Sequence, residues 1–124
     1  MERKITRKVK VGSVYVGGDS PVSIQSMTNT DTRDVEATLA QIRALHVASC
    51  EIIRCAVPDM EAAQAIKDIC AGSPMPVVAD IHFDYRLALK CVENGISAIR
   101  INPGNIGNIE RVKAVTEACK AKNI

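Results

Sequence analysis

The sequence predicts an α/β fold, an N-terminal β-hairpin followed by four strand–helix units that form the first half of a TIM (β/α)8 barrel. Four short apolar runs alternate with segments whose apolar residues recur at helical spacing. The runs start roughly 22 to 29 residues apart, which is typical of strand–helix–strand crossovers in a parallel sheet. They are also almost continuously apolar, as in strands whose two faces are covered. With 124 residues, the chain is long enough for one domain.

Residues 1–21 are expected to form a β-hairpin. Valines alternate with lysine or tyrosine over residues 9–11 and 14–16, and Gly12–Ser13 supplies a turn between the two strands. The segment 17–21, with the sequence GGDSP, separates the hairpin from the next predicted strand. We expect this hairpin to cap the floor of the barrel.

Residues 22–124 are expected to form the four strand–helix units of the half-barrel. The strands are predicted at about 22–28, 51–57, 76–82 and 97–102. Each helix follows a side chain suited to N-capping, and the candidates are Asp31 or Thr32, Asp59, Asp84 and Asn108. Each helix also has an apolar face, which in the last helix comprises Ile109, Val112, Val115 and Cys119.

Two parallel folds fit this order of elements: an open doubly wound sheet, or half of a barrel of roughly 250 residues. A dinucleotide-binding doubly wound sheet carries G-x-G-x-x-G directly after its first strand. This chain has no glycine over residues 27–30, where that turn would begin. The leading hairpin also suits a barrel floor, so the half-barrel is the favoured fold.

Charge and composition exclude several classes of function. Sixteen basic and fourteen acidic side chains leave a net charge of +2, and aromatic residues make up 2%, so nothing favours nucleic-acid binding. No apolar run reaches the roughly 18 residues of a membrane span, and the N-terminus lacks the apolar core of a signal peptide. These features predict a soluble cytoplasmic protein without a nucleic-acid or membrane partner.

The cysteines indicate a reducing compartment. Their number is odd and none are spaced as C-x-x-C, so we expect free thiols and no metal site. Most are interpreted as small buried apolar residues. The five are Cys50, Cys55, Cys70, Cys91 and Cys119.

Two arginines lie in apolar strands. Arg54 belongs to the second predicted strand and Arg100 to the fourth. A guanidinium is costly in such a place unless it is paired or faces a polar cavity. Two of them on one sheet would suit a forked grip on phosphate oxygens. The alternative is an internal ion pair, for example of Arg54 with Asp80 or Glu51, and both interpretations stay open.

Asp80 and His82 are the candidate catalytic residues. They are two residues apart at the end of the third strand, so both side chains lie on one face of the sheet. At the carboxyl end of a parallel strand they are a plausible pair for proton transfer or for orienting a substrate. The alternative is a capping aspartate followed by a loop histidine.

Polar residues also come after the first and fourth strands. Asn102 and Asn105 flank Pro103–Gly104 just before a helix N-terminus, where backbone N–H groups can approach an anion. Ser26 and Thr28 give the end of the first strand a hydroxyl-rich character. All four are candidate substrate-binding residues, although hydroxyls near an N-cap also bond to the backbone.

Three segments of the chain resemble one family. Residues 22–32 (VSIQSMTNTDT), 78–84 (VADIHFD) and 99–107 (IRINPGNIG) are similar to the N-terminal part of the hydroxymethylbutenyl-diphosphate synthase family, also called GcpE. The similarity runs from about Lys8 to the end of the chain. Three long motifs in the right order make it specific.

The resemblance implies a fold and an activity. The family has a TIM barrel followed by a domain that holds a [4Fe-4S] cluster on three cysteines and a glutamate. The enzyme opens 2-C-methyl-D-erythritol 2,4-cyclodiphosphate reductively, with two electrons and release of water, and forms 4-hydroxy-3-methylbut-2-enyl diphosphate for non-mevalonate isoprenoid biosynthesis. Flavodoxin or ferredoxin donates the electrons. The enzyme is a homo-oligomer, in which a partner subunit's cluster domain closes over the barrel mouth.

The resemblance also implies roles for residues at matching positions. Arg54 and Arg100 resemble diphosphate-binding arginines, and His82 resembles a histidine that contacts the substrate. Asp80 and Asn102 line the same mouth.

The chain departs from the family pattern by stopping at Ile124, so the remaining barrel strands and the cluster domain are expected to be absent from it. None of its five cysteines matches a cluster ligand. We therefore expect this polypeptide alone to be inactive, and to self-associate because a half-barrel leaves open sheet edges. The alternatives are another phosphate-binding barrel, similar to dihydropteroate synthase, and a non-catalytic self-associating half-barrel.

Overall fold

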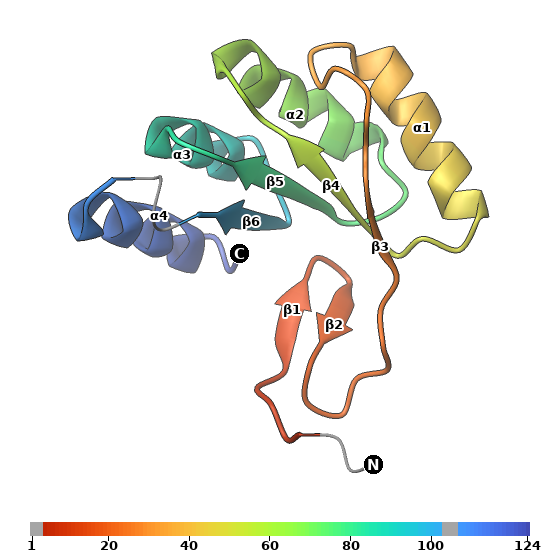
Figure 1. The fold of residues 1–124 in the computed structure, drawn as a ribbon, viewed down its shortest axis with the longest axis horizontal. Helices are drawn as coiled ribbons and strands as arrows, with labels where there is room; N and C mark the ends of the chain where they lie inside the picture. Colours follow the sequence, from red (N-terminus) through yellow and green to blue (C-terminus); the bar gives the residue numbers. More distant parts are fainter. Residues whose placement is uncertain (1–3, 103–106) are drawn as a thin grey trace.

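The computed structural model describes residues 4–102 and 107–124, which form a hairpin and four parallel strand–helix units (Figure 1). The strands are β1 (Val9–Val11), β2 (Val14–Val16), β3 (Gln25–Met27), β4 (Ile52–Ala56), β5 (Val77–Ile81) and β6 (Ala98–Ile101). The helices are α1 (Val35–Val47), α2 (Met60–Gly72), α3 (Tyr85–Glu93) and α4 (Ile109–Ala121). The predicted α/β order is confirmed.

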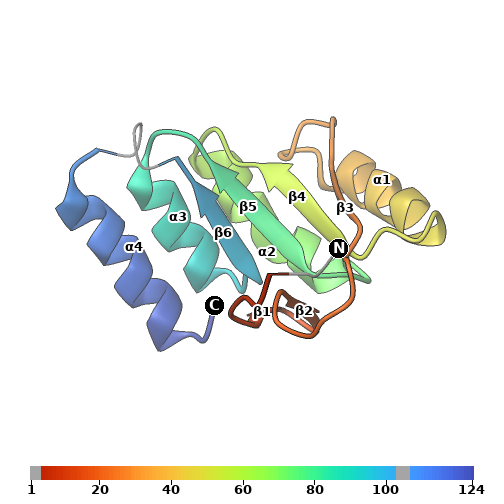
Figure 2. The same ribbon diagram turned by 60° about the horizontal axis from the view of Figure 1, so that its bottom comes forward.

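The main sheet is parallel, with the strand order β3-β4-β5-β6. Figure 2 shows the helices gathered along one side of this sheet. β3 is shorter than the predicted strand at 22–28. It lies at one end of the described sheet, where Val22 and Ile24 are exposed and β4 is its single neighbouring strand.

The core lies between the sheet and the helices. Odd-numbered residues of β4 and β5, such as Ile53 and Ile81, are fully buried there against Ile66 and Ile69 of α2. Each such side chain contributes about 1.5–3 kcal/mol by leaving water. The prediction that Ile109 belongs to the inward face of α4 is wrong, because this residue is exposed near the carboxyl end of the sheet. The other three members of that face, Val112, Val115 and Cys119, belong to the core or pack against it.

Three of the predicted N-caps are confirmed and one is not. Asp59, Asp84 and Asn108 accept hydrogen bonds from backbone N–H groups at the starts of α2, α3 and α4. The cap of α1 is Asp34, whose carboxylate accepts from the N–H of Ala37 at 3.1 Å. The two expected candidates have other partners: Asp31 pairs with the Arg33 side chain, and Thr32 bonds to a carbonyl of β4.

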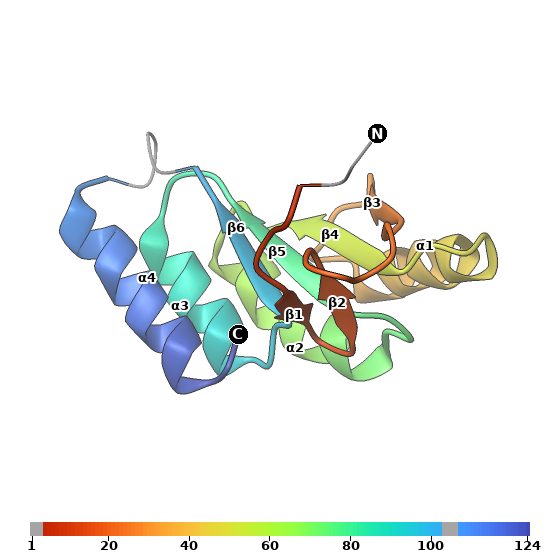
Figure 3. The ribbon, with the colours of Figure 1, turned by 90° about the horizontal axis from the view of Figure 1, so that it is seen from below.

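The hairpin packs against the starts of β5 and β6. β1 and β2 are antiparallel, and the turn between them needs a glycine because Gly12 has a φ of +58°. A Cβ atom at Gly12 would lie 2.9 Å from Pro76 and 3.1 Å from Ser97, the residues that directly precede those strands. Figure 3 shows the hairpin at this end of the sheet. This position fits the expected floor cap, while the division of the chain at residue 21 stays a prediction.

No helix in the described ranges is long and apolar enough to cross a membrane.

Candidate functional site

A buried carboxylate, Asp80, lies among three basic side chains near the carboxyl end of β5. Arg100 Nη1 donates a hydrogen bond to Asp80 Oδ1 at 2.9 Å. On the other carboxylate oxygen, Oδ2, Arg54 Nε lies at 3.8 Å and His82 Nε2 at 3.6 Å. We call these four residues the Asp80 cluster.

Strand register explains why the cluster forms. Asp80 is in register with Arg100 on β6 and with Ala56 on β4, and Arg54 lies two residues before Ala56. Because side chains alternate along a strand, these residues share the sheet face that points away from the helices. The prediction that Asp80 and His82 share a face is therefore confirmed.

The cluster is buried at its acidic centre and open at its basic ends. The Asp80 side chain is 3% exposed, whereas the side chains of Arg54, Arg100 and His82 are 33%, 45% and 46% exposed. Two guanidiniums face one carboxylate, so the cluster carries an excess of positive charge even with a neutral imidazole. Excess positive charge with partly exposed N–H donors is an arrangement suited to an anion.

One of the two ion pairs considered for Arg54 is present and the other is not. Arg54 lies beside Asp80, and Arg100 shares the same carboxylate. Glu51 instead accepts a hydrogen bond from the N–H of Ile24 at 3.1 Å. The ion pair does not exclude ligand binding, since both arginines keep part of their surface in solvent.

The remaining candidate residues are not all brought to this cluster. Ser26 is in register with Ile53, so it belongs to the helix-facing side of the sheet. Thr28 is buried, and its hydroxyl donates to Arg54 O at 3.5 Å. Asn102 directly follows β6, two residues after Arg100. Asn105 lies outside the described residues.

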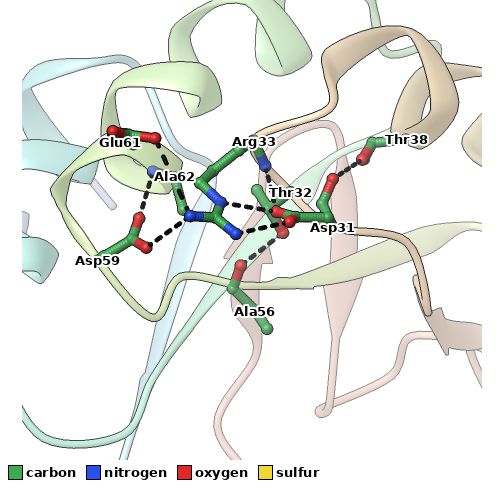
Figure 4. A network of polar contacts seen from close by, with 8 residues as sticks. All are labelled: Asp31, Thr32, Arg33, Thr38, Ala56, Asp59, Glu61 and Ala62. Carbon is green, nitrogen blue, oxygen red and sulfur yellow. Dashed lines mark hydrogen bonds and ion pairs between the residues drawn. The ribbon is translucent and has the colours of Figure 1, made fainter.

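The loop between β3 and α1 has a dense network of polar contacts, shown in part in Figure 4. The Thr32 hydroxyl donates to Ala56 O, and the hydroxyls of Thr30 and Thr38 are 2.8 Å apart. The backbone N–H of Asn29 donates to Gln41 Oε1 at 2.9 Å, and Gln41 Nε2 donates to Asn29 Oδ1 at 2.7 Å. The polar side chains that follow β3 thus use much of their hydrogen-bonding capacity to fix the conformation of this loop.

Arg33 lies at the centre of the exposed part of this network. Its Nε and Nη2 groups donate to the two oxygens of Asp31, at 3.1 and 2.8 Å. Its Nη1 lies 3.5 Å from Asp59 and 4.0 Å from Glu61. Hydrogen bonds from Arg33 lower the pKa of Asp31 to about 2. Sequence reasoning missed Arg33, although its place between a candidate cap and a helix start was a usable signal.

The described residues do not fit an iron–sulfur cluster. Within residues 4–102 and 107–124, no group of three or more His, Cys, Asp or Glu side chains is arranged to hold a metal ion. The cysteines are free thiols, and burial raises the pKa of both Cys70 and Cys91 to about 12. Such thiols stay protonated at neutral pH and behave as apolar core residues.

Fold and site together define a class of protein, a parallel α/β domain of barrel type with basic side chains gathered around a buried carboxylate at the carboxyl ends of its strands. Residues 6–124 match the family model described as the GcpE TIM-barrel domain, and the chain belongs to this family. The resemblance found in the motifs is thereby confirmed, and the dihydropteroate synthase-like alternative is set aside.

Curated relatives share high identity with this chain. It is 71% identical over 124 residues to 4-hydroxy-3-methylbut-2-en-1-yl diphosphate synthase (flavodoxin) of Clostridium perfringens and 63% identical to the synthase of the same name of Clostridium acetobutylicum. In both cases the alignment covers 100% of this chain and 36% of the relative. The chain therefore spans about a third of the length of these relatives.

Solved structures support the fold alone. A mandelate oxidase with benzoyl-formic acid superposes with a TM-score of 0.58 at 13% identity, covering 98% of this chain and 62% of that one. The Y128F mutant of mandelate oxidase with a C4a-OH-FMN adduct has a TM-score of 0.58 at 17% identity. The match covers 81% of this chain and 41% of the mandelate oxidase chain.

Proposed function

We propose that this chain forms part of the diphosphate-binding mouth of an enzyme that converts 2-C-methyl-D-erythritol 2,4-cyclodiphosphate to 4-hydroxy-3-methylbut-2-enyl diphosphate. Family membership and the names of the relatives support this reaction. The observation that carries the proposal is the Asp80 cluster, in which two arginines and a histidine surround one buried carboxylate and remain partly open to solvent.

In this proposal the two arginines bind the diphosphate. Guanidiniums bind phosphate oxygens through paired N–H donors, and both are held at the mouth by the same carboxylate. Asn102 and Asn105 are proposed as further contacts, because in the sequence they flank Pro103–Gly104 just before the start of α4. Ser26 and Thr28 are proposed to stabilise the end of β3 rather than to contact the substrate. The strand register of Ser26 and the burial of Thr28 direct them away from the Asp80 cluster.

His82 is the proposed proton donor at the mouth. The reaction releases water, so a departing hydroxyl must gain one proton. His82 is nearly half exposed, and its Nε2 lies 3.6 Å from Asp80 Oδ2. The electrons are proposed to come from flavodoxin or ferredoxin through a [4Fe-4S] cluster in the longer, cytoplasmic protein. The residues described here bind and orient the substrate and supply the proton.

Binding of inorganic diphosphate and of the cyclodiphosphate, measured by isothermal titration calorimetry, tests the arginines. Arg100→Ala should weaken both affinities by roughly ten- to a hundred-fold, because hydrogen bonds to charged groups are worth about 1.5–3 kcal/mol. The matched control is Arg86→Ala, since Arg86 is exposed and pairs with Asp84 on α3. Equal affinities for wild type and Arg100→Ala would contradict the proposal.

The open edge of β6 favours self-association as a second candidate property. β6 is the last strand of the described sheet, and a groove of roughly 680 Å³ lies beside it. Its lining is largely apolar and includes Val9, Val11, Ile99, Ile101, Val115 and Ile124. Unpaired strand edges recruit further chains. Light scattering should give a mass above that of the monomer, and a sharp monomer mass across concentrations would contradict this.

A further inference from the structure

We propose that Thr32 and Arg33 act as positioning residues that hold Arg54 at its distance from Asp80. These two neighbours in the β3–α1 loop form what we call the Thr32–Arg33 clamp. The positional claim stands on hydrogen bonds and strand register. Its consequence for ligand binding rests on the proposed diphosphate-binding function.

The Thr32 arm of the clamp holds the end of β4. Thr32 is 3% exposed, and its hydroxyl donates to Ala56 O. Ala56 is in register with Asp80, and the next residue, Val57, donates its N–H to Asp80 O at 3.1 Å. The hydroxyl therefore fixes β4 at the level of the sheet where the Asp80 carboxylate lies.

This hydrogen bond continues the sheet after β3 has ended. Arg54 O accepts from the N–H of Thr28 at 3.0 Å, so this carbonyl of β4 points toward the β3 side. The carbonyl of Ala56, two residues later, points the same way because strand geometry repeats every two residues. β3 ends at Met27, and the Thr32 hydroxyl supplies a donor there. Without this donor the part-buried carbonyl of Ala56 loses its partner, which weakens the attachment of β4 at this level of the sheet.

The Arg33 arm holds the start of α2. Arg33 Nη1 lies 3.5 Å from the carboxylate of Asp59, which caps α2 through the N–H of Ala62 at 2.9 Å. Thr32 and Arg33 thus grip the two ends of the short connection between Ala56 and Asp59 (Figure 4). The Arg33 arm is solvent-exposed, so its contribution should be the smaller one.

The position of the Arg54 side chain depends on these two contacts. In the described part of the chain, Arg54 Nε is buried without a hydrogen-bond partner, at 3.8 Å from Asp80 Oδ2. That separation exceeds hydrogen-bond length, so the position of β4 against β5 sets it. A small slip of Ala56 would change the spacing of the two charges and the direction of the guanidinium.

Nitrogen-15 NMR of the arginine Nε–H groups tests the clamp without a ligand. Thr32→Val removes the hydroxyl but keeps the side-chain shape, and Thr32→Ser keeps the hydroxyl. We expect the Arg54 Nε–H resonance to shift or broaden in Thr32→Val. In Thr32→Ser it should keep its wild-type position and line width. The control is Thr116→Val, because Thr116 is exposed on α4 and its hydroxyl also donates to a carbonyl, that of Val112 at 2.9 Å.

Affinity for inorganic diphosphate tests the consequence of the clamp for binding. Thr32→Val should weaken this affinity about fivefold, in line with the loss of one part-buried hydrogen bond, while the affinities of Thr32→Ser and Thr116→Val should stay near that of wild type. An unchanged Arg54 resonance and affinity in Thr32→Val would overturn the proposal. If wild type binds no diphosphate, the proposed function fails, and the resonance alone still decides whether the clamp exists.

A variant on the exposed arm covers the case in which Thr32→Val fails to fold. Arg33→Gln removes the contacts to Asp31 and Asp59 at a surface position. We expect a smaller shift of the Arg54 resonance in the same direction and a weakening of diphosphate affinity of about twofold. An Arg54 resonance identical to that of wild type in Arg33→Gln would then refute the positioning role.

Discussion

Replacing Asp80 with asparagine removes the negative charge that two arginines share and leaves the side-chain volume nearly unchanged. The Asp80 carboxylate is almost fully buried, while Arg54 and Arg100 face each other's charge across it. In the variant, the two guanidiniums lose their common counter-charge. The fold should therefore become less stable, although the sheet keeps its backbone hydrogen bonds.

The expected loss depends on the exposure of the partners. Removing one member of a fully buried ion pair costs about 3–5 kcal/mol. Here the arginine side chains remain 33% and 45% exposed, so water compensates part of the lost interaction. The asparagine oxygen also keeps one acceptor for Arg100. We expect the free energy of unfolding to fall by about 2 kcal/mol, intermediate between buried and surface pairs.

Urea unfolding followed by circular dichroism measures this loss. Glu93→Gln is the control, because Glu93 is exposed and lies 3.6 Å from Lys90 on the surface of α3. It removes the same charge and should cost less than about 0.5 kcal/mol. The result that would refute this reasoning is a loss of unfolding free energy in Asp80→Asn no larger than that in Glu93→Gln, with the same dependence on urea concentration. The carboxylate would then not be the centre of the site.

Three further predictions concern the core, the loop network and the thiols. Ile66→Ala should lower the free energy of unfolding by about 2–5 kcal/mol in urea titrations, because Ile66 is fully buried; a loss below about 1 kcal/mol would contradict the packing. Asp31 has a lowered pKa, so its stabilising effect is present above its ordinary pKa of 3.8 and is lost as pH falls through about 2. Arg33→Gln should return that pKa toward 3.8 in an NMR titration of the carboxylate, and no rise would refute the assignment. Cys91, with its pKa raised to about 12 by burial, should resist iodoacetamide at about pH 8 until urea unfolds the chain; rapid labelling of the native protein would count against it.

Most of the fold could be predicted because β4 and β5 and their helices have strong local signals. Apolar runs, a proline after β4 and aspartate caps all indicate the same boundaries. The cap of α1 could not be chosen from the sequence, since two candidates, Asp31 and Thr32, stand beside a third residue suited to capping, Asp34. Only the fold shows that Asp31 pairs with Arg33 and that Thr32 bonds to Ala56, which leaves Asp34 as the cap.

The candidate site was only partly predictable for a similar reason. Alternation along one strand places Asp80 and His82 on the same face, and this needs no knowledge of other strands. Whether Arg54 pairs with Asp80 or with Glu51 depends on the register between strands, which one sequence does not specify. The direction of Ser26 likewise depends on its pairing with Ile53.

The hairpin touches the beginnings of β5 and β6, whereas the Asp80 cluster lies toward their ends. The two features are therefore separated along the strands and have no residue in common. Substitutions in the hairpin can adjust how well the domain tolerates heat while leaving the geometry around Asp80 as it is. Substitutions at exposed hairpin positions such as Val9 and Tyr15 can be screened for higher stability, with Gly12 kept for its turn. The same separation means that the hairpin end of the domain and the end that carries the Asp80 cluster can be altered independently of each other.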